Sequence, residues 1–329
     1  MIIENAILHI FDFSIDSNIL SDVEIDLSDV GVYEFIQKHL KNCINNTNVE
    51  KAIADKECMF INTIEEYEEF VEYSKEIATK IYELLSKSNS RNSFDLLMLK
   101  YSEDEVEYIA ILYLKHRPAF TRMIEQTEDG LANQMIKHNT IFIGTSSKVD
   151  NFALVNLDDY SLRFIEDKIE IDNEVSPIFS KHLFNCIKVT KPTKQILKEV
   201  DKLVEEVAIE YNANPTIALT KAKNYINNKV EFEDEISAVE LSAEVFEESS
   251  DMQEKFVSLA KEKEIPTKIE VDKKVVNKVA KNQKIKTDTG IEIIFPSEYS
   301  ENREYIEFVN NCDGTISIQI KNIAKILNK

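Results

Sequence analysis

The chain has 329 residues and a formal net charge of −21, because 60 acidic side chains outnumber 39 Lys and Arg. With 43% hydrophobic residues, including 17 Phe and 12 Tyr, it can bury enough apolar surface to fold, which excludes a wholly disordered protein. A chain with this much negative charge repels polyanions. Any surface of it that binds nucleic acid therefore has to be locally positive.

The sequence predicts a cytoplasmic protein without a membrane segment. No apolar run reaches the ~20 residues that cross a bilayer, and the first residues lack the positive start and small-residue cleavage site of a signal peptide. The cysteines are far apart and form no C-x-x-C pair, so we expect reduced core thiols rather than a zinc site or a disulfide framework. These residues are Cys43, Cys58, Cys186 and Cys312.

The chain opens with a strand-like pattern that gives way to a helix. Residues 5–13 mix β-branched and aromatic side chains as a buried strand does, and residues 23–27 alternate apolar and acidic side chains like a second strand. Ser28 or Asp29 is expected to cap a helix that runs towards Asn42.

The next hundred residues predict one long helix and then a sheet. Apolar side chains keep helical spacing over residues 64–85, above an acidic opposite face. Short strand-like runs separated by polar turns follow, which favours an antiparallel meander over parallel crossovers. These runs cover residues 94–99, 108–114, 119–124, 140–144 and 152–157. We expect one mixed, mainly antiparallel sheet with flanking helices.

After Val189-Thr-Lys-Pro192 the pattern becomes helical. An apolar stripe predicts a helix over 196–211, and Asn214-Pro215 starts the next one. Further predicted helices cover residues 237–246, 251–262 and 273–282, and predicted strands cover 291–295, 305–309 and 315–320. The fold class is therefore α+β, with an α+β domain at 1–189 and a second domain at 190–329. The second domain is mainly helical and includes a C-terminal basic helix and a small sheet that ends in a β-hairpin.

No motif for catalysis is present. Phosphate-binding loops and the H-E-x-x-H zinc motif are absent, and the five histidines never fall at i, i+4 spacing. Ser146-Ser147 follows Gly144 without the pattern of a nucleophile elbow. Acid pairs such as Asp158-Asp159 arise without catalytic purpose in a chain with 60 acids. We expect a non-enzymatic protein with no metal and no cofactor.

The most informative stretch is the lysine segment, residues 268–286. It holds seven lysines against two acids, a net charge of +5 that leaves −26 for the rest of the chain. On a helix Lys274, Lys278 and Lys281 would share one face and valines another, which suits a stripe of phosphate contacts. An ordinary amphipathic surface helix is the alternative. The candidate DNA-binding residues are Lys273, Lys274, Lys278, Lys281, Lys284 and Lys286.

Two further charged stretches can be explained either by a structural role or by a binding function. Lys115, Arg117 and Arg122 lie around Pro118 and are secondary DNA-binding candidates, although charges at a strand edge also block aggregation. Residues 231–251 contain nine acids and no Lys or Arg. This acidic run indicates either a solvated surface or an acidic surface that docks a partner or mimics DNA.

Several distributed patterns resemble the bacterial nucleoid-associated proteins of the NdpA type over nearly the whole chain. They are Asn5-Ala-Ile-Leu-His9, Tyr108-Ile-Ala-Ile-Leu-Tyr113, Leu154-Val-Asn-Leu-Asp-Asp-Tyr160, Gly290-Ile-Glu-Ile-Ile-Phe295 and Thr315-Ile-Ser-Ile-Gln-Ile320. The resemblance implies association with the nucleoid, DNA binding and no known catalytic residues. Such proteins have a glycine-rich link before the tail strands, where this chain has Asn282-Gln-Lys-Ile-Lys-Thr287.

Two hypotheses follow. In the first, the chain is a nucleoid-associated protein that binds double-stranded DNA, independently of its sequence, through the lysine segment. In the second, it is an acidic adaptor that a protein partner recruits to the nucleoid without direct DNA contact. A hydrolase or nuclease is a third reading that would need clustered acids and a metal. The DNA sequence preference, the protein partner and any oligomer stay open.

Overall fold

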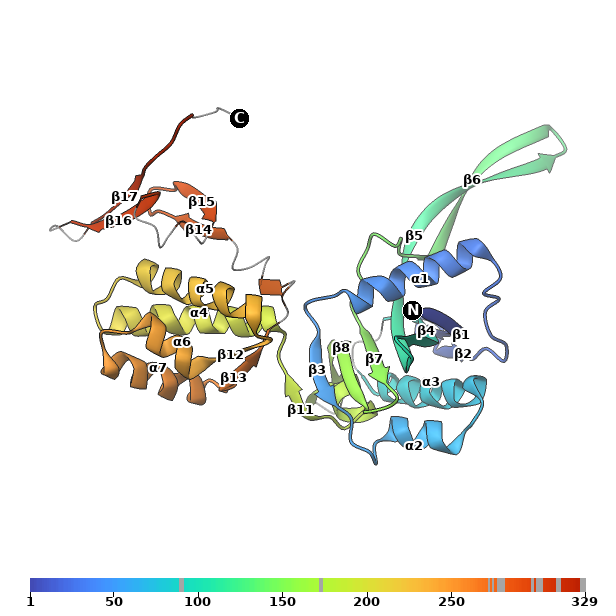
Figure 1. Ribbon diagram of the computed structural model, residues 1–329. Coiled ribbons are helices and arrows are strands. Elements are labelled where there is room, and N and C mark those ends of the chain that lie inside the picture. The colour runs from blue at the N-terminus through green and yellow to red at the C-terminus, as the bar shows by residue number, and fades with distance from the viewer. Residues whose placement is uncertain are drawn as a thin grey trace. The chain divides into compact units, whose positions relative to one another are not determined.

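The computed structural model describes most of the chain in two compact units, Met1–Thr190 (unit 1) and Lys191–Lys329 (unit 2). The residues described are 1–88, 92–171, 174–271, 273, 275–276, 282–296, 299, 304–311 and 315–325. Figure 1 shows the strands of the large sheet in unit 1 and the helices of unit 2.

Unit 1 is built on one sheet with the strand order β11-β3-β8-β7-β5-β4-β1-β2, and β6 pairs with β5. All pairings between its described strands are antiparallel. The strands are β1 (Ile2–Asp12), β2 (Ser17–Ile19), β3 (Glu50–Ile53), β4 (Phe94–Glu103), β5 (Val106–Thr127), β6 (Gly130–Phe142), β7 (Phe152–Asn156), β8 (Ser161–Ile165) and β11 (Ile187–Thr190). A separate hairpin joins β9 (Lys168–Ile171) and β10 (Glu174–Pro177).

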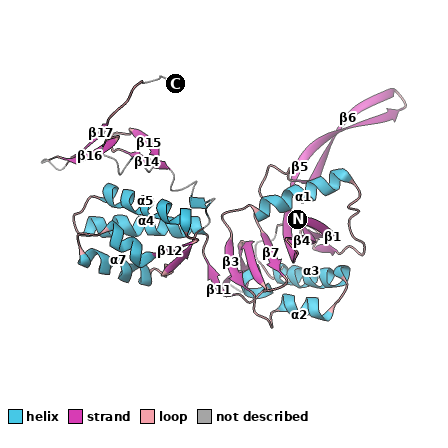
Figure 2. Ribbon diagram, in the orientation of Figure 1, coloured by secondary structure: helices cyan, strands magenta, loops and turns pink. Residues whose placement is uncertain are grey.

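Helices cover both faces of this sheet, so unit 1 has three layers (Figure 2). The helix α1 (Val30–Ile44) packs on one face, and α2 (Met59–Glu66), α3 (Phe70–Ser86) and the short π-helix η1 (Ile178–Leu183) pack on the other. Strand β4 shows why helices are needed on both faces of the sheet, because its alternate side chains are buried on opposite faces. Leu96 and Met98 belong to the core under α3, whereas Leu97 and Leu99 belong to the core under α1.

Unit 2 is a helical core with small antiparallel pairs of strands. Its helices are α4 (Thr193–Glu210), α5 (Pro215–Phe232), α6 (Ala238–Val245) and α7 (Ser250–Glu262). Its hairpins and pairs are β12 (Glu235–Ser237) with β13 (Lys268–Glu270), β14 (Asn282–Lys286) with β15 (Glu292–Pro296), and β16 (Ile306–Asn310) with β17 (Ile316–Ile320). The α+β class, the mainly antiparallel sheet and the C-terminal hairpin are therefore confirmed.

Some predicted elements differ from the structure. Residues 23–27 are a loop, although the Ile25 amide donates one backbone hydrogen bond to the Ala6 carbonyl over 2.7 Å. The helix predicted over 64–85 is two helices, because α2 ends at Glu66 and α3 begins at Phe70. Within the described residues no helix combines the length and the apolar character needed to span a membrane.

The joint between the units suggests a proteolysis experiment. Lys191 is exposed at the start of unit 2, next to Pro192, which precedes α4. We predict that the segment after Thr190 folds separately, so limited digestion with a protease of broad specificity should leave stable fragments on either side. Mass spectrometry would identify the ends. Two separate domains would be the wrong description of this joint if no stable fragment ended between Cys186 and Ile196.

Candidate nucleic-acid interface

The lysine segment begins beside the acidic run of residues 231–251. Strand β13 pairs with β12, and the Lys268 ammonium lies 3.2 Å from the Glu235 carboxylate. The next lysine, Lys273, lies 3.4 Å from Asp234 Oδ1. The acidic run therefore neutralises the first lysines of the segment. The sequence did not reveal these ion pairs, because the paired residues are more than thirty positions apart in the chain.

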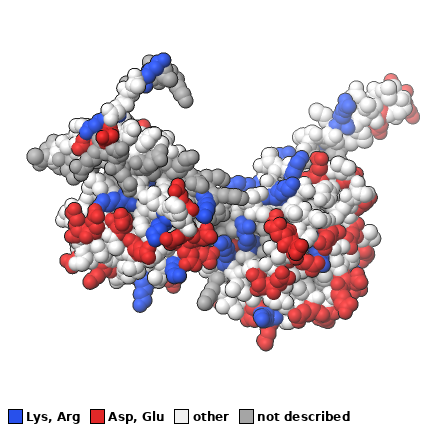
Figure 3. Space-filling model, viewed as in Figure 1, with Lys and Arg blue, Asp and Glu red and all other residues white. Residues whose placement is uncertain are grey.

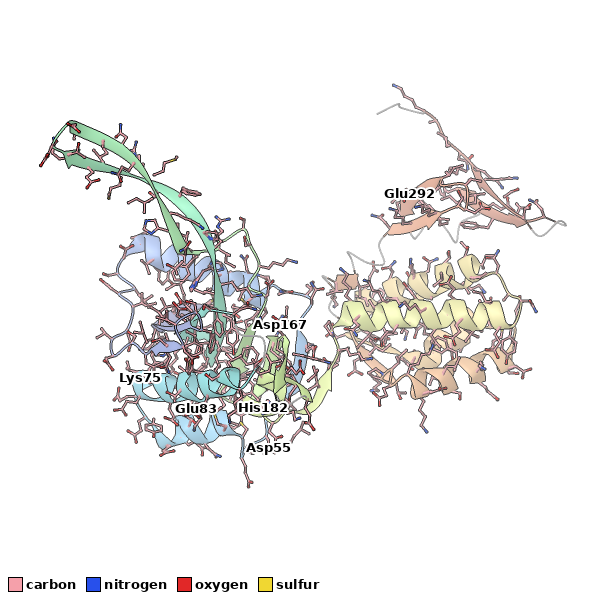
Figure 4. All side chains as sticks on the ribbon, turned by 180° about the vertical axis from the view of Figure 1, so that it is seen from behind. Asp55, Lys75, Glu83, Asp167, His182 and Glu292 are labelled. Carbon is pink, nitrogen blue, oxygen red and sulfur yellow. The ribbon has the colours of Figure 1, made fainter. Side chains whose placement is uncertain are left out.

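The end of the lysine segment is a strand rather than a helix. Asn282 begins β14, so the predicted helix does not reach this residue, although Val275 and Val276 have helical backbone and are buried. The Lys284 ammonium lies 2.8 Å from Glu292 Oε2 on the paired strand, where Figure 4 labels Glu292. Lys286 is exposed and has no ion pair with any described residue.

Three of the predicted lysines fall outside the described residues. They are Lys274, Lys278 and Lys281, which formed the predicted helical stripe. Of the other three, Lys273 precedes the buried valines, and Lys284 and Lys286 lie two residues apart on β14. Alternate residues of a strand share a face, so these two lysines project from the same side of the hairpin.

A second basic surface lies on a long hairpin of unit 1. We define the arm as residues 117–127 of β5 and 130–141 of β6, which pair in antiparallel register and are almost entirely exposed. The arm extends away from the sheet in both Figure 1 and Figure 4. Arg117 and Arg122 lie on it, and neither forms an ion pair with another described residue.

At the base of the arm the charges are paired internally. The Lys115 ammonium lies 3.0 Å from Asp150 and 4.0 Å from Asp167, which Figure 4 labels. His116 Nε2 lies 3.0 Å from Asp95 Oδ1, close enough for an ion pair although the two atoms are not aligned as a hydrogen bond. Burial raises the pKa of Asp95, and His116 opposes that shift. Lys115 is therefore a weaker candidate for phosphate contact than Arg117 or Arg122.

The sequence interpretation missed Lys137, which is exposed on β6 opposite Phe120. Residues 130–139 were assigned to no strand because polar side chains interrupt any alternating pattern. The signal that could have found this strand is Asp129-Gly130, a dipeptide typical of hairpin turns. Gly130 has a φ of +124°, a conformation that side chains other than glycine rarely adopt.

Other polar clusters have structural explanations. A cavity of about 1000 Å³ lies between α5 and β16, but two of its lysines are paired with acids, Lys221 with Glu247 and Lys229 with Glu233. Ser176 Oγ lies 2.8 Å from His182 Nε2, yet the serine is buried. Among the described residues, no group of three or more His, Cys, Asp or Glu side chains could hold a metal ion.

The distribution of charged side chains on the surface also shows local positive sites on an acidic protein. On the face shown in Figure 3, red acidic atoms spread over both units, while basic atoms on the arm lie nearer the sheet than the acidic atoms at its tip. By the strand register, Arg117, Arg122 and Lys137 lie nearer the base of the arm than Glu125, Glu128 and Asp129.

Comparison with known families accounts for nearly the whole chain. No individual curated protein matches it in sequence. The model of the family described as nucleoid-associated protein YejK matches residues 7–328, which spans both units and confirms the resemblance to nucleoid-associated proteins. The chain belongs to the family of the nucleoid-associated protein YejK.

Proposed function

We propose that this nucleoid-associated protein binds duplex DNA directly, through sequence-independent phosphate contacts from the lysine segment, and that it binds rather than catalyses. The observation that carries the proposal is the exposed pair Lys284 and Lys286 on one side of β14, in the densest positive stretch of a chain with a net charge of −21. Lysine ammonium groups that reach solvent are suited to replacing the counterions of DNA phosphates.

The ion pairs of Lys273 and Lys284 do not oppose this function strongly. The side chains are 53% and 57% exposed, and their acidic partners are also open to solvent. Exposed pairs of this kind contribute only about 0–1 kcal/mol, so a phosphate can replace the carboxylate at little cost. Arg117 and Arg122 on the arm are the secondary candidates, since no acid of the described residues pairs with them.

The proposal is tested by the salt dependence of binding to a duplex of mixed sequence. If four lysines contact phosphates, log affinity should fall with log salt with a slope of about −0.9 × 4, or roughly −3.6. A fourfold rise in salt would then weaken binding about a hundredfold. Fluorescence anisotropy of a labelled duplex, repeated with a second unrelated sequence, gives both the slope and any preference.

Charge reversal locates the contacts. Replacing Lys274, Lys278 and Lys281 together by Glu should abolish duplex binding equally for all sequences, because phosphate contacts carry no base information. The matched control reverses three exposed lysines elsewhere, Lys56, Lys202 and Lys261, and so changes the net charge by the same amount. Equal losses in both triple variants would mean that total charge matters and that the lysine segment is only a solvated surface.

The acidic adaptor is the second candidate function. The net charge of −21 and the acids that pair with Lys268 and Lys273 favour it. It becomes the better description if the purified wild-type protein binds no duplex even at low salt, where electrostatic attraction is strongest. Association with the nucleoid would then run through a protein partner.

A further inference from the structure

The arm has one apolar face that nothing covers among the described residues. Directly opposed residues of an antiparallel pair share a face, so the register assigns every side chain of the arm to one of two sides. One side carries Phe120, Ile124, Leu131 and Met135, and we call it the apolar face. Across the strands, each of these four residues lies opposite a polar residue of the same side: Lys137, Asn133, Gln126 and Arg122. The other side carries Thr121, Glu125, Gln134 and His138, together with the less exposed Met123 and Ile136.

The exposure of the apolar face is large. Phe120 is 69% exposed, Ile124 62%, Leu131 74% and Met135 83%. Single exposed apolar residues are ordinary on a protein surface, but these four follow one another diagonally along one side of the ribbon. Such a row of exposed apolar side chains is typical of an interaction surface. An isolated two-stranded hairpin is at best marginally stable in water, so the arm gains from a surface that covers this face.

The same unit offers an apolar groove that could receive such a face. Its volume is about 420 Å³, and it lies between α1 and the sheet near the base of the arm. Its lining is apolar: Leu8, Ile25, Val32, Phe35, Leu114 and Phe142. Since the arm extends away from the sheet in Figures 1 and 4, its apolar face does not cover the groove of its own chain.

We propose that the arm docks on a second copy of this chain, as a two-fold symmetric dimer in which each apolar face covers the partner's groove. Phe142 ends β6 at the base of the arm and also lines the groove, so the two complementary surfaces meet there. Two arms running antiparallel therefore bring each apolar face to the base of the other arm. A two-fold axis makes both contacts identical and closes the assembly at two copies.

Charge supports a protein partner over nucleic acid at this face. Residues 117–142 contain three basic and three acidic side chains, so the arm is neutral on a chain of −21. Arg122 and Lys137 lie on the apolar face between the hydrophobic side chains. The exposed acids Asp26 and Asp29 do not line the groove, but they adjoin its residues Ile25 and Gly31 in sequence and suit these two cations at its rim. Acids at the tip would repel the phosphates of DNA.

The area of such an interface is sufficient for a stable dimer. Eleven paired residues at ~3.4 Å per residue give an arm about 35 Å long, and two strands give a width of about 10 Å. One face then presents roughly 350 Å². Two arm faces contribute roughly 700 Å², and an equal area on the grooves and the surface around them would bring the total to about 1,400 Å², which lies within the range of stable protein interfaces.

The experiment is sedimentation of the full chain at micromolar concentrations without DNA. The wild-type protein should be a dimer, and the variant Leu131→Asp with Met135→Asp should dissociate with a dimer Kd raised about a hundredfold or more, because two carboxylates would enter an apolar contact. The control is Thr121→Asp with Gln134→Asp, which places the same charges on the polar side. This variant should stay dimeric. Circular dichroism would show that all three proteins are folded.

A mixing experiment then identifies the receptor surface. Val32→Asp, in the groove, should also give monomers, yet a mixture of this variant with the arm variant should form heterodimers of intermediate affinity, since one intact arm can still meet one intact groove. The proposal is overturned if the wild type stays monomeric, if the apolar-face variant dimerises like the wild type, or if the mixture forms no heterodimer. A monomeric wild type whose duplex binding is lost in the apolar-face variant would assign the arm to DNA instead.

Discussion

Acidification from pH 6.5 to pH 4 should destabilise unit 1, and replacing His9 by Gln should remove much of that effect. His9 is fully buried in β1, and its Nδ1 accepts the Ser21 amide over 3.1 Å. The proton must therefore sit on Nε2, which lies 3.2 Å from the Ser74 hydroxyl. That hydroxyl donates to the Val71 carbonyl. A second proton on the ring would face the Ser21 N–H.

Burial, and then the nearby charge of Lys75 on α3 (Figure 4), lower the pKa of His9 from 6.5 to about 4. Because the folded pKa lies below the unfolded one, the unfolded chain binds more protons between these values. Stability is therefore complete above pH 6.5 and falls as the pH drops towards 4, by up to about 3 kcal/mol. Burial also lowers the pKa of His39, so a weaker pH dependence should remain in the His9 variant.

The measurement is a series of urea unfolding curves from pH 7 to pH 4, read by pulsed hydrogen exchange so that each unit reports separately. His9→Gln keeps an oxygen that can accept the Ser21 amide but carries no titrating ring. The control is His138→Gln, whose imidazole is exposed on the arm and should not change the slope. An unchanged pH dependence in His9→Gln would show that the buried ring is not the origin of the acid sensitivity.

Replacing Asp201 by Asn should stabilise unit 2 at neutral pH. Asp201 lies on α4, and burial raises the pKa of its carboxyl to about 6, with Glu205 adding to the shift and Lys223 opposing it. The folded pKa exceeds the unfolded value of 3.8, so this carboxyl costs no stability below pH 3.8. The cost grows as the pH rises towards 6 and is complete above it. At pH 7 the cost is up to about 3 kcal/mol.

Asparagine has the shape of aspartate without the charge, so the gain should be present at pH 7 and absent near pH 4. The same pulsed-exchange measurement, applied to peptides of α4, gives both values. Glu254→Gln is the matched control, because this acid is exposed on α7 of the same unit, does not contribute to the shift of Asp201 and should change stability by only about 0.5 kcal/mol. A gain that is equal at both pH values would point to packing or helix propensity rather than to the buried charge.

The sequence predicted the core strands well because their burial leaves a pattern. Strands β4 and β7 are apolar runs, and Asp29 and Asn214 begin their helices as their side chains suggested. The arm was harder to predict. Separate strands were predicted over residues 108–114 and 119–124, on either side of Pro118. Strand β5 instead continues through a register shift between Arg117 and Ala119, which tolerates a residue without an amide hydrogen.

The candidate site shows a different limit. A net charge counted along the sequence treats the lysine segment as isolated, whereas strand pairing places Glu235 beside Lys268 and Glu292 beside Lys284. Such pairings depend on the register of strands, which a local pattern does not specify. For the same reason the apolar face of the arm was invisible in the sequence, since it is composed of residues from two strands with mainly polar neighbours.

The strand order of unit 1 also sets when the protein can finish folding during its synthesis. Strand β3 pairs with β8 and β11, which lie more than a hundred residues later in the chain. At about 5–20 residues per second, roughly 7 to 28 s separate the synthesis of β3 from that of β11. Hairpins such as β4–β5 can form as they leave the ribosome, but this edge of the sheet has to wait for residue 190. The nascent chain therefore carries an unpaired strand until its first unit is complete.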